Sequence, residues 1–334
     1  MNSRYTYFFV LCLIILSSCF KEEKRLEPHV SGNILQSTIP MEADYKNQVF
    51  FDLESNTLVS KNIKSDWDLG FITQDSSYQI ILNTAKFMKA ANTNSESFDE
   101  IRSDKTYSYF FDPSHGQLDS TAIGAWGKFE NNKYSGNKKV YIIDRGLSLT
   151  GKRLGYKKVV FDSIANKTFY FHHANLNGNL LAQSKIEKND SFNMVCFSFD
   201  QPEQTLKIEP PKNLWDLQFT QYTTMLYTDL GEEYPYLVTG VLLNRNGVTA
   251  CADSNSVFDE INFNYAQNKE LSHQMDIIGY NWKAYDFDSQ TYTVKDSFNY
   301  IIRDTEGFLF RLRFIGFNNE QGLKGYPRIE FQKL

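Results

Sequence analysis

One pentapeptide occurs twice in this chain of 334 residues, and it constrains the fold more than any other feature. Residues 67–71 read WDLGF, and residues 215–219 read WDLQF. The same spacing also aligns two upstream elements, Phe51-Asp52 with Phe199-Asp200 and Leu58 with Leu206. One shared pentapeptide is compatible with chance, but a shared register over roughly twenty residues predicts an internal duplication, which then fixes the architecture.

The repeat continues downstream with a larger spacing between its copies. Residues 98–101 and 258–261 both read FDEI, and Tyr141-Ile142-Ile143 resembles Tyr300-Ile301-Ile302. The larger spacing predicts an insertion in the second copy between Phe219 and Leu242. We therefore expect two diverged copies, at residues 46–190 and 191–334.

Strand signals dominate the chain. Trp67, Leu69 and Phe71 alternate with small or polar residues, so a strand would place all three on one face of a sheet. Aromatic residues make up 15% of the chain, and they favour strands. Further strands are predicted at Val49–Leu53, Gln79–Asn83, Val140–Asp144, Lys157–Asp162, Lys167–His172, Asn193–Phe199, Tyr236–Asn244, Ser297–Arg303, Phe308–Phe317 and Arg328–Gln332.

Helical signals are few. A short helix is predicted at Ser256–Ala266, with a matching one after Ser97. The expected fold class is therefore mainly β, with antiparallel sheets, few short helices and two tandem modules. The alternative is one pseudo-symmetric domain in which both copies share a core.

The N-terminus reads as a targeting segment. Arg4 precedes an apolar run at residues 8–16, which is too short to span a bilayer, and Leu16-Ser17-Ser18-Cys19 follows. This sequence resembles a bacterial lipobox, which predicts a signal peptide at residues 1–18, a lipid on Cys19 and a tether over residues 19–45. A plain secretory signal is the alternative. Phe20-Lys21-Glu22-Glu23 resembles a surface-export signal of Bacteroidetes lipoproteins.

Several functional classes lack support in the sequence. The net charge is −5 and no large basic cluster occurs, which argues against nucleic-acid binding. No phosphate loop, Gly-x-Ser-x-Gly, His-Glu-x-x-His or Cys-x-x-Cys motif is found, so we expect neither an enzyme nor a metal site. Asp286–Asp288 and Asp253–Glu260 are acidic but lack the glycine of a calcium loop, and solvated loops explain them.

Histidine and methionine supply the candidate ligands. His273 and Met275 lie two residues apart, so an extended segment would present both on one face. Imidazole and thioether are both axial ligands of haem iron, which makes the pair a candidate haem site. Met225, in the insertion, and His172 are further candidates, although His172 and its neighbour also fit an exposed pair at a strand end. His115 lies in a predicted turn.

Two cysteines follow the targeting segment, Cys196 and Cys251. Cys196 lies in a strand-like run, where a buried free thiol is the simplest interpretation. A disulfide between the two is the alternative.

These motifs resemble the HmuY family of Bacteroidetes lipoproteins. The resemblance rests on the twin Trp-Asp strands, on residues 236–248 (YLVTGVLLNRNGV) and on the segment from Tyr300 to Pro327. It covers the second copy throughout and the first copy in part. The resemblance implies an all-β haemophore-like protein at the cell surface, which captures haem and passes it to a TonB-dependent receptor for iron acquisition.

The sequence therefore supports two functional hypotheses. The first is a non-enzymatic, lipid-anchored outer-membrane protein that binds haem, without nucleic-acid partners. The second is a structural or interaction lipoprotein that docks a receptor or a glycan-uptake partner. In either case we expect binding to come from segments that the copies do not share, chiefly the insertion after Phe219.

Overall fold

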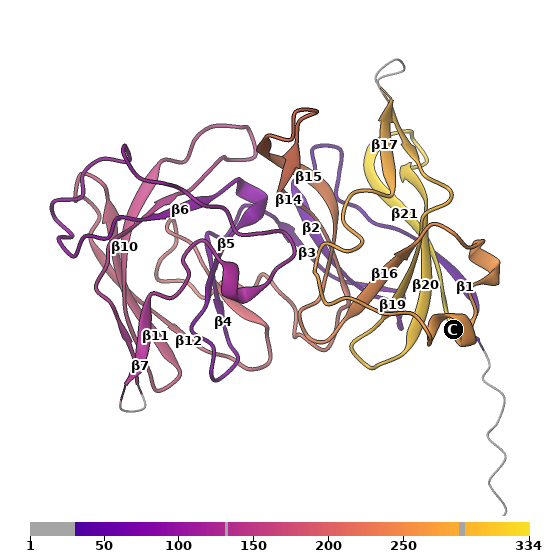
Figure 1. Ribbon diagram of the computed structural model, residues 1–334, viewed down its shortest axis with the longest axis horizontal. Coiled ribbons are helices and arrows are strands. Elements are labelled where there is room, and N and C mark those ends of the chain that lie inside the picture. Colours follow the sequence, from indigo (N-terminus) through magenta and orange to yellow (C-terminus); the bar gives the residue numbers. More distant parts are fainter. Residues whose placement is uncertain (1–30, 131–132, 287–290) are drawn as a thin grey trace, which may run out of the picture. The chain divides into compact units, whose positions relative to one another are not determined.

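The structure is a computed structural model that describes residues 31–130, 133–286 and 291–334, and it is mainly β as predicted (Figure 1). All strand pairs between named strands are antiparallel. Residues 31–334 form one compact unit. Within the described ranges, no helix has the length and apolar character needed to cross a bilayer.

Two sheets are built from the middle of the chain. A seven-stranded sheet has the order β12-β11-β10-β8-β7, with β9 joining β10 and β6 joining β9, and a three-stranded sheet has the order β13-β4-β5. Their strands are β4 (Leu69–Ile72), β5 (Ile80–Leu82), β6 (Lys89–Asn92), β7 (Gly127–Glu130), β8 (Lys133–Gly136), β9 (Tyr141–Asp144), β10 (Tyr156–Ala165), β11 (Thr168–Asn175), β12 (Ala182–Glu187) and β13 (Met194–Phe197).

The other sheets combine the N-terminal strands with the C-terminal part of the chain. Their orders are β1-β21-β20-β19-β16, β15-β14-β2-β3 and β17-β18. The strands are β1 (Ile34–Thr38), β2 (Asn47–Asp52), β3 (Thr57–Ile63), β14 (Leu217–Tyr227), β15 (Glu233–Leu243), β16 (Thr249–Asp253), β17 (Lys283–Asp286), β18 (Thr291–Val294), β19 (Asn299–Arg303), β20 (Leu309–Asn318) and β21 (Lys324–Lys333).

The helical segments are short. They are the 3-10 turns η1 (Thr84–Lys86), η2 (Leu118–Ser120) and η3 (Phe258–Glu260) and the α-helix α2 (Phe263–Ala266). The helix predicted at Ser256–Ala266 is therefore split into η3 and α2. The helix predicted after Ser97 is wrong: residues 98–100 form a turn, in which Glu100 N–H donates to the Ser97 carbonyl at 3.2 Å.

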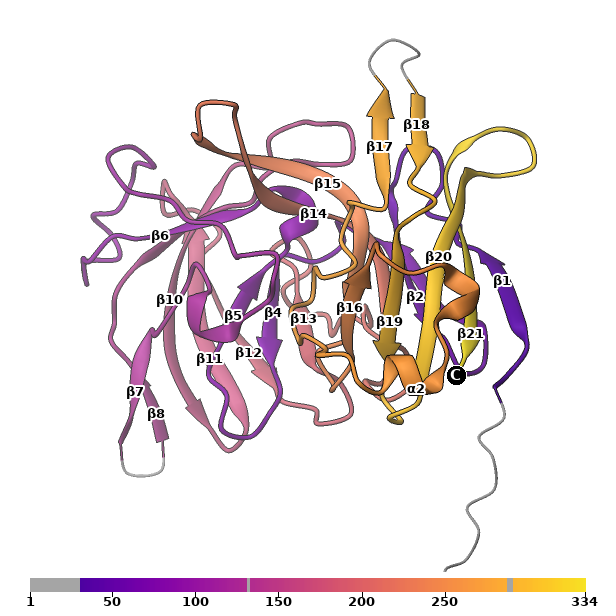
Figure 2. The same cartoon turned by 45° about the vertical axis from the view of Figure 1, so that its right-hand side comes forward.

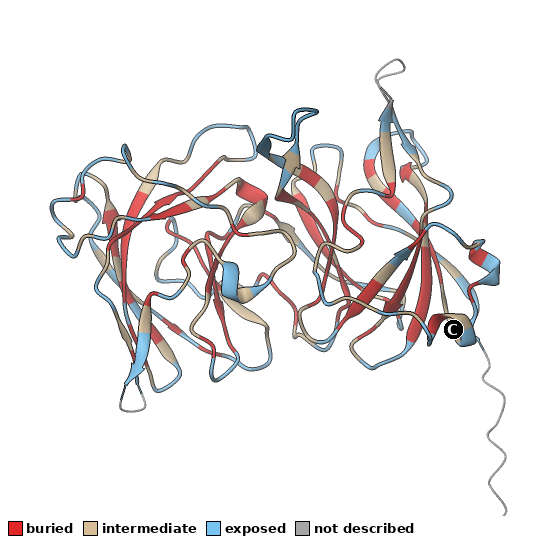
Figure 3. Ribbon diagram, in the orientation of Figure 1, coloured by how far each residue is buried: buried red, intermediate tan, exposed pale blue. Residues whose placement is uncertain are grey.

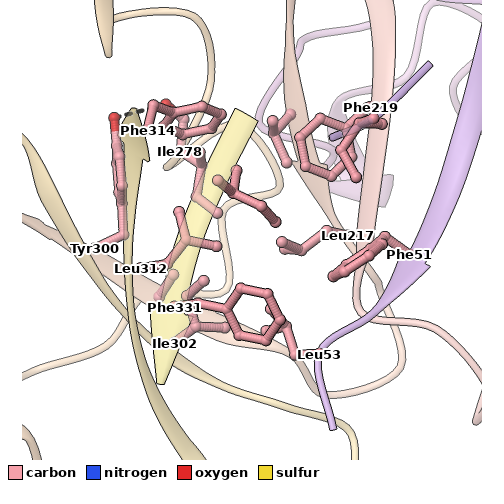
Figure 4. Packing of buried hydrophobic residues seen from close by; sticks show 14 of the residues in the cluster. Phe51, Leu53, Leu217, Phe219, Ile278, Tyr300, Ile302, Leu312, Phe314 and Phe331 are labelled. Carbon is pink, nitrogen blue, oxygen red and sulfur yellow. Dashed lines mark hydrogen bonds between the residues drawn. The ribbon is translucent and has the colours of Figure 1, made fainter. Parts of the chain in front are cut away.

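Two large hydrophobic clusters form the main cores, and most of their residues come from strands (Figure 3). One cluster draws on residues 39–53 and 217–331 (Figure 4), and the other on residues 69–199. The predicted boundary at residue 190 does not follow this division. β2 lies beside β14, and β13 lies beside β4, so the first strand of each predicted copy pairs with the Trp-Asp strand of the other.

The two Trp-Asp motifs make matching contacts. Asp68 N–H donates to Phe197 O at 2.7 Å, and Asp216 N–H donates to Phe51 O at 2.9 Å. A buried asparagine, Asn83 or Asn244, follows each motif and caps it through its side-chain amide. Asn83 donates to Lys64 O and Trp67 O, both at 2.8 Å, and Asn244 donates to Lys212 O and Trp215 O at 2.7 and 2.6 Å.

The FDEI segments also match. Lys158 Nζ donates to Phe98 O at 2.7 Å and to Ile101 O at 3.2 Å. Arg311 makes the equivalent pair of bonds to the carbonyls of Phe258 and Ile261. The two FDEI segments are thus held by the same kind of contact, a buried cationic side chain that donates to two backbone carbonyls.

Three details differ from the sequence predictions. Leu69 and Phe71 enter a main core, but Trp67 precedes β4 and packs in a separate cluster with Ile72 and Cys196. Residues 34–38 of the predicted tether form β1, which pairs with β21. Ile39 and Met41 are fully buried beyond it, so the tether prediction does not hold for residues 34–41.

Candidate functional site

Two loops meet between the parts of the structure that enclose the two main hydrophobic cores. The first loop follows β6 and contains His115; the second precedes β17 and contains His273 and Met275. Met275 N–H donates to the His115 carbonyl at 3.0 Å, and Leu243 N–H donates to the Met275 carbonyl at 2.8 Å. Backbone hydrogen bonds therefore hold the histidine loop against the His-Met segment and, through it, against β15.

The first loop is anchored by a buried carboxylate. Asp112 accepts hydrogen bonds from Leu82 N–H of β5 and from Ala122 N–H farther along the same loop, both at 2.7 Å, which ties the loop to β5 and to itself. Burial raises the pKa of Asp112 to about 6. Its neighbour Ser114 contacts Thr224 Oγ1 at 2.9 Å and donates to Asp276 Oδ2 at 2.5 Å, so side chains as well as backbone bind the two loops together.

The loop turns at Gly116, whose φ is +75°. A Cβ at this position would overlap Met275 Sδ, so glycine is needed both for the backbone conformation and for the close approach of the methionine. Arg245 donates from Nη1 to the Gly116 carbonyl and reinforces the same contact.

The joined loops border an open cleft of about 820 Å³. Its lining includes His115, His273, Met275, Arg245, Lys212 and Asn193. His273 is exposed, whereas His115 and Met275 are half-buried. His115 Nδ1 accepts a hydrogen bond from Gln117 N–H at 3.1 Å, so its other ring nitrogen is the one available to a ligand. The structure thus brings two histidines and a thioether to one surface.

A smaller cavity of about 80 Å³ adjoins this cleft and shares Gly116, Arg245 and Met275 with it. Both motif tryptophans, Trp67 and Trp215, line it, and each indole Nε1 is buried without a hydrogen-bond partner among the described residues.

Charged groups surround this smaller cavity. Glu209 accepts a hydrogen bond from Asn193 N–H at 3.3 Å, and burial raises its pKa to about 7. Burial also lowers the pKa of Arg245.

The structure places the four sequence-predicted ligands in three locations. His273 and Met275 share the 820 Å³ cleft. Met225 lines a neighbouring cleft of about 430 Å³, to which His115 also contributes. His172 lies on β11, with Nδ1 3.1 Å from the Asp162 carboxylate and its ring 4.8 Å from that of Phe98, and it lines neither cleft.

The expectation of an exposed histidine pair on β11 is wrong for His173. His173 is 2% exposed and packs against Phe197 and Phe199, because its side chain lies on the face of β11 that points into the core. Burial lowers the pKa of His173 to about 4. His115 is the residue that sequence reasoning noted without placing in the site, since only the Met275–His115 backbone bond reveals the contact.

The alternative of a disulfide between the two cysteines is wrong. Cys196 and Cys251 are both free thiols, with Cys196 buried. Burial raises the pKa of the Cys196 thiol well above its usual range, which makes it a poor nucleophile. The predicted lipidation site Cys19 lies outside the described residues.

Comparisons with known proteins identify one family. A family model described as HmuY protein matches residues 44–331. No curated protein matches the sequence.

Three solved structures are similar over most of their length. They are apo PinO from Porphyromonas gingivitis (9% identity, TM-score 0.26, covering 90% of this chain and 97% of that one), a putative HmuY-like heme-binding protein from Bacteroides vulgatus (10%, 0.23, 91% and 97%) and an apo HmuY analog from Tannerella forsythia (6%, 0.25, 91% and 98%). Similarity at these TM-scores supports no inference about the site.

Proposed function

Because the chain belongs to the HmuY protein family, we propose that it is a haem-binding protein rather than an enzyme. The resemblance to this family implies haem capture. One observation supports a particular site for the haem. The hydrogen bond from Met275 N–H to His115 O, at 3.0 Å, holds the two loops together, so that His115, His273 and Met275 line one cleft.

The donor set of the cleft fits haem. Imidazole nitrogen and thioether sulfur are the two side-chain donors that hold haem iron in cytochromes c, and both types are present here. The cleft volume of about 820 Å³ lies within the usual range for ligand sites, about 300–1,000 Å³. His273 and Met275 are the first candidates for the iron, with His115 as the alternative partner.

Two cationic and two apolar residues of the cleft fit the periphery of the same ligand, although the carboxylates of Asp75 and Asp190 also line it. Lys212 and Arg245 are cationic and line the cleft, where they would pair with haem carboxylates. The apolar side chains of Leu118 and Phe192 would cover part of the apolar ring and exclude water. Bound haem would supply the iron that the protein captures, and the chain's own residues would orient and shield it.

We further propose that the protein is a lipoprotein of the outer membrane. The segment Leu16-Ser17-Ser18-Cys19 supports a lipid on Cys19, and Lys21-Glu22-Glu23 supports display at the cell surface. One acyl chain gives only marginal membrane binding, so several chains on the same cysteine would be needed for stable anchoring. A TonB-dependent receptor is the proposed recipient of the haem.

The test is a haemin titration of the chain from Phe20 onward, which contains the whole compact unit. A new Soret band is expected under oxidising or reducing conditions. His273→Ala and Met275→Ala should each shift the band or weaken binding. His172→Ala is the matched control, because its ring is engaged by Asp162 and Phe98 outside the cleft, and it should leave the spectrum unchanged.

Two outcomes would count against the proposal. No spectral change in either redox state would remove haem binding, and an effect of His172→Ala alone would move the site to β11. Co-purification with an outer-membrane partner in the absence of a haem spectrum would instead favour the docking hypothesis.

A further inference from the structure

Exposed tyrosines gather on two hairpins. Six tyrosines are among the exposed large hydrophobic side chains of the described residues, and five of them lie on the β14–β15 and β17–β18 hairpins. They are Tyr227, Tyr234, Tyr236, Tyr285 and Tyr292. Figure 2 shows the two hairpins projecting from the same side of their sheets. The β14–β15 hairpin contains the insertion predicted after Phe219.

A cleft of about 370 Å³ lies between these hairpins. We call it the tyrosine cleft, and its aromatic lining consists of Tyr45, Tyr236, Tyr280, Tyr285, Tyr292 and Phe317. Tyr236 is 52% exposed and Tyr292 is 44% exposed, so their rings are accessible. Such exposure of large rings around one hollow marks a binding surface more often than scattered single residues do.

The aromatic walls are held in place by the core. Trp282 stacks on Phe314 with ring centroids 3.9 Å apart, and Phe317 packs against Trp282 at 5.9 Å. Tyr292 lies on Phe317 at 5.6 Å and beside Tyr285 at 4.9 Å. The cleft is therefore a preorganised site, which lowers the entropy cost of binding.

The ring planes are tilted and not parallel. The interplanar angle is 58° for Tyr285 and Tyr292 and 53° for Tyr292 and Phe317. A flat ligand such as a porphyrin needs parallel faces to stack on more than one ring. A puckered ring with several C–H faces contacts tilted aromatic planes, and a pyranose has this shape.

The polar groups of the cleft are mostly donors. Lys283 and Lys324 line it, and no Asp or Glu is found among the described residues of the lining. Lys283 Nζ donates to Thr239 O at 2.5 Å and lies 4.3 Å from the centroid of the Trp282 ring and 5.7 Å from that of Tyr292. These amines favour an anionic ligand over a cationic one.

From this geometry we propose that the tyrosine cleft binds a hexuronic acid residue of an acidic glycan. The tilted tyrosine rings contact the C–H faces of the sugar, while the two lysine amines and the tyrosine hydroxyls bind its carboxylate and hydroxyl groups. The site is separate from the His115 cleft, and the inference does not rest on haem binding.

Binding of a carboxylate is expected to depend on pH. Burial lowers the pKa of Lys283 to about 7, so its amine loses its charge as the pH rises from 6 to 8. Burial raises the pKa of Tyr45 to about 12 and also raises that of Tyr280 and Tyr292, so these phenols stay neutral in this range.

The other titratable side chains in the described lining of the tyrosine cleft are Tyr236, Tyr285 and Lys324. Because the charged fraction of an amine with a pKa near 7 falls about tenfold between pH 6 and pH 8, affinity should fall with it.

The probes are digalacturonic acid and the neutral disaccharide maltose, titrated calorimetrically into the chain from Phe20 onward. Digalacturonic acid should bind at pH 6 and about tenfold more weakly at pH 8, and maltose should bind more weakly than the acid at pH 6. Tyr236→Ala should weaken the acid's binding roughly tenfold. Lys283→Met should abolish the pH dependence.

Tyr170→Ala is the matched control, since Tyr170 is 40% exposed on β11 in another sheet, and it should bind like the unmodified chain. Absence of binding by both disaccharides would overturn the proposal, as would equal effects of Tyr236→Ala and Tyr170→Ala. Equal affinity for maltose and the acid would overturn the assignment to an acidic sugar. A haemin titration of Tyr236→Ala should be unchanged, which separates failure of this site from failure of the haem proposal.

Discussion

Replacing Arg145 by methionine should destabilise the protein strongly, because this guanidinium neutralises a carboxylate that has no access to water. Asp68 belongs to the first Trp-Asp motif and is 0% exposed, and Arg145 is 5% exposed. Arg145 Nε and Nη2 donate to the two Asp68 oxygens at 3.1 and 3.0 Å, which is a bidentate pair. The same guanidinium donates to both oxygens of Asp200, at 2.9 and 2.7 Å.

The expected loss is about 3 kcal/mol of unfolding free energy. Removing one partner of a buried ion pair costs about 3–5 kcal/mol, because the remaining charge stays buried without compensation. Two contacts place Arg145→Met at the low end of this range: Lys86 Nζ still pairs with Asp68, and Phe199 N–H still donates to it at 2.9 Å. The contact with Asp200 adds little, since that carboxylate is 65% exposed.

Chemical denaturation of the chain from Phe20 onward measures this loss, and Lys139→Met is the control. Lys139 Nζ pairs with Glu96 at 3.0 Å, and the two side chains are 30% and 58% exposed, so its removal should cost about 0–1 kcal/mol. A loss below about 1 kcal/mol for Arg145→Met, or one equal to that of the control, would refute the argument. Adding Asp68→Asn to Arg145→Met should cost less than the sum of the two single changes.

Two further predictions concern other buried charges. The folded-state pKa of Glu209, about 7, lies above its ordinary value of 4.5, so the folded state binds the proton more tightly and stability is lost as the pH rises from about 4.5 to about 7. Glu209→Gln should remove this loss, which is up to about 3 kcal/mol, when unfolding curves are measured at pH 5 and pH 8. An equal change in unfolding free energy between the two pH values in both proteins would contradict it. Lys158→Met leaves the carbonyls of Phe98 and Ile101 without their donor and should cost about 1–3 kcal/mol by denaturation, whereas an unchanged midpoint would show that the bonds contribute nothing.

Local patterns predicted the strands well where apolar residues either run continuously or alternate over several positions. The segments predicted at 140–144, 193–199 and 308–317 overlap β9, β13 and β20. The segment predicted as an insertion after Phe219 lies in the hairpin of β14 and β15, which has eleven residues in each strand, whereas β4 and β5 have four and three. Period two and turn residues are local signals, and these features depend on little else.

Features that depend on partners distant in the chain were not predictable. β1 is a short polar strand whose pairing with β21 spans nearly the whole chain, and nothing in Ile34–Thr38 marks it as a strand. The contact between the His115 loop and Met275 likewise exists only after both halves have folded. The sequence predicts His173 as a polar residue at a strand end. Its side chain points into the core, because adjacent residues of β11 point to opposite faces and His172 lies beside Asp162 on the other face.

The Trp-Asp motif combines two roles that its sequence pattern does not separate. Its Leu and Phe side chains build the two main cores, Leu69 and Phe71 in one and Leu217 and Phe219 in the other.

The two tryptophans instead line the same small cavity, at the junction where the His115 loop meets the His273–Met275 segment. Trp215 packs edge-on against Phe50 of β2, with ring centroids 4.9 Å apart, so the junction also depends on the exchanged N-terminal strand.

The strand pairings divide the described chain into two units, one built from β4 to β13 and the other from β1 to β3 together with β14 to β21. In this arrangement neither unit is complete at the predicted boundary near residue 190. One strand of each unit holds a loop of the proposed haem cleft: Leu82 N–H of β5 donates to Asp112, and Leu243 N–H of β15 donates to the Met275 carbonyl. The proposed haem site therefore depends on both units, because His115 comes from one and His273 and Met275 come from the other.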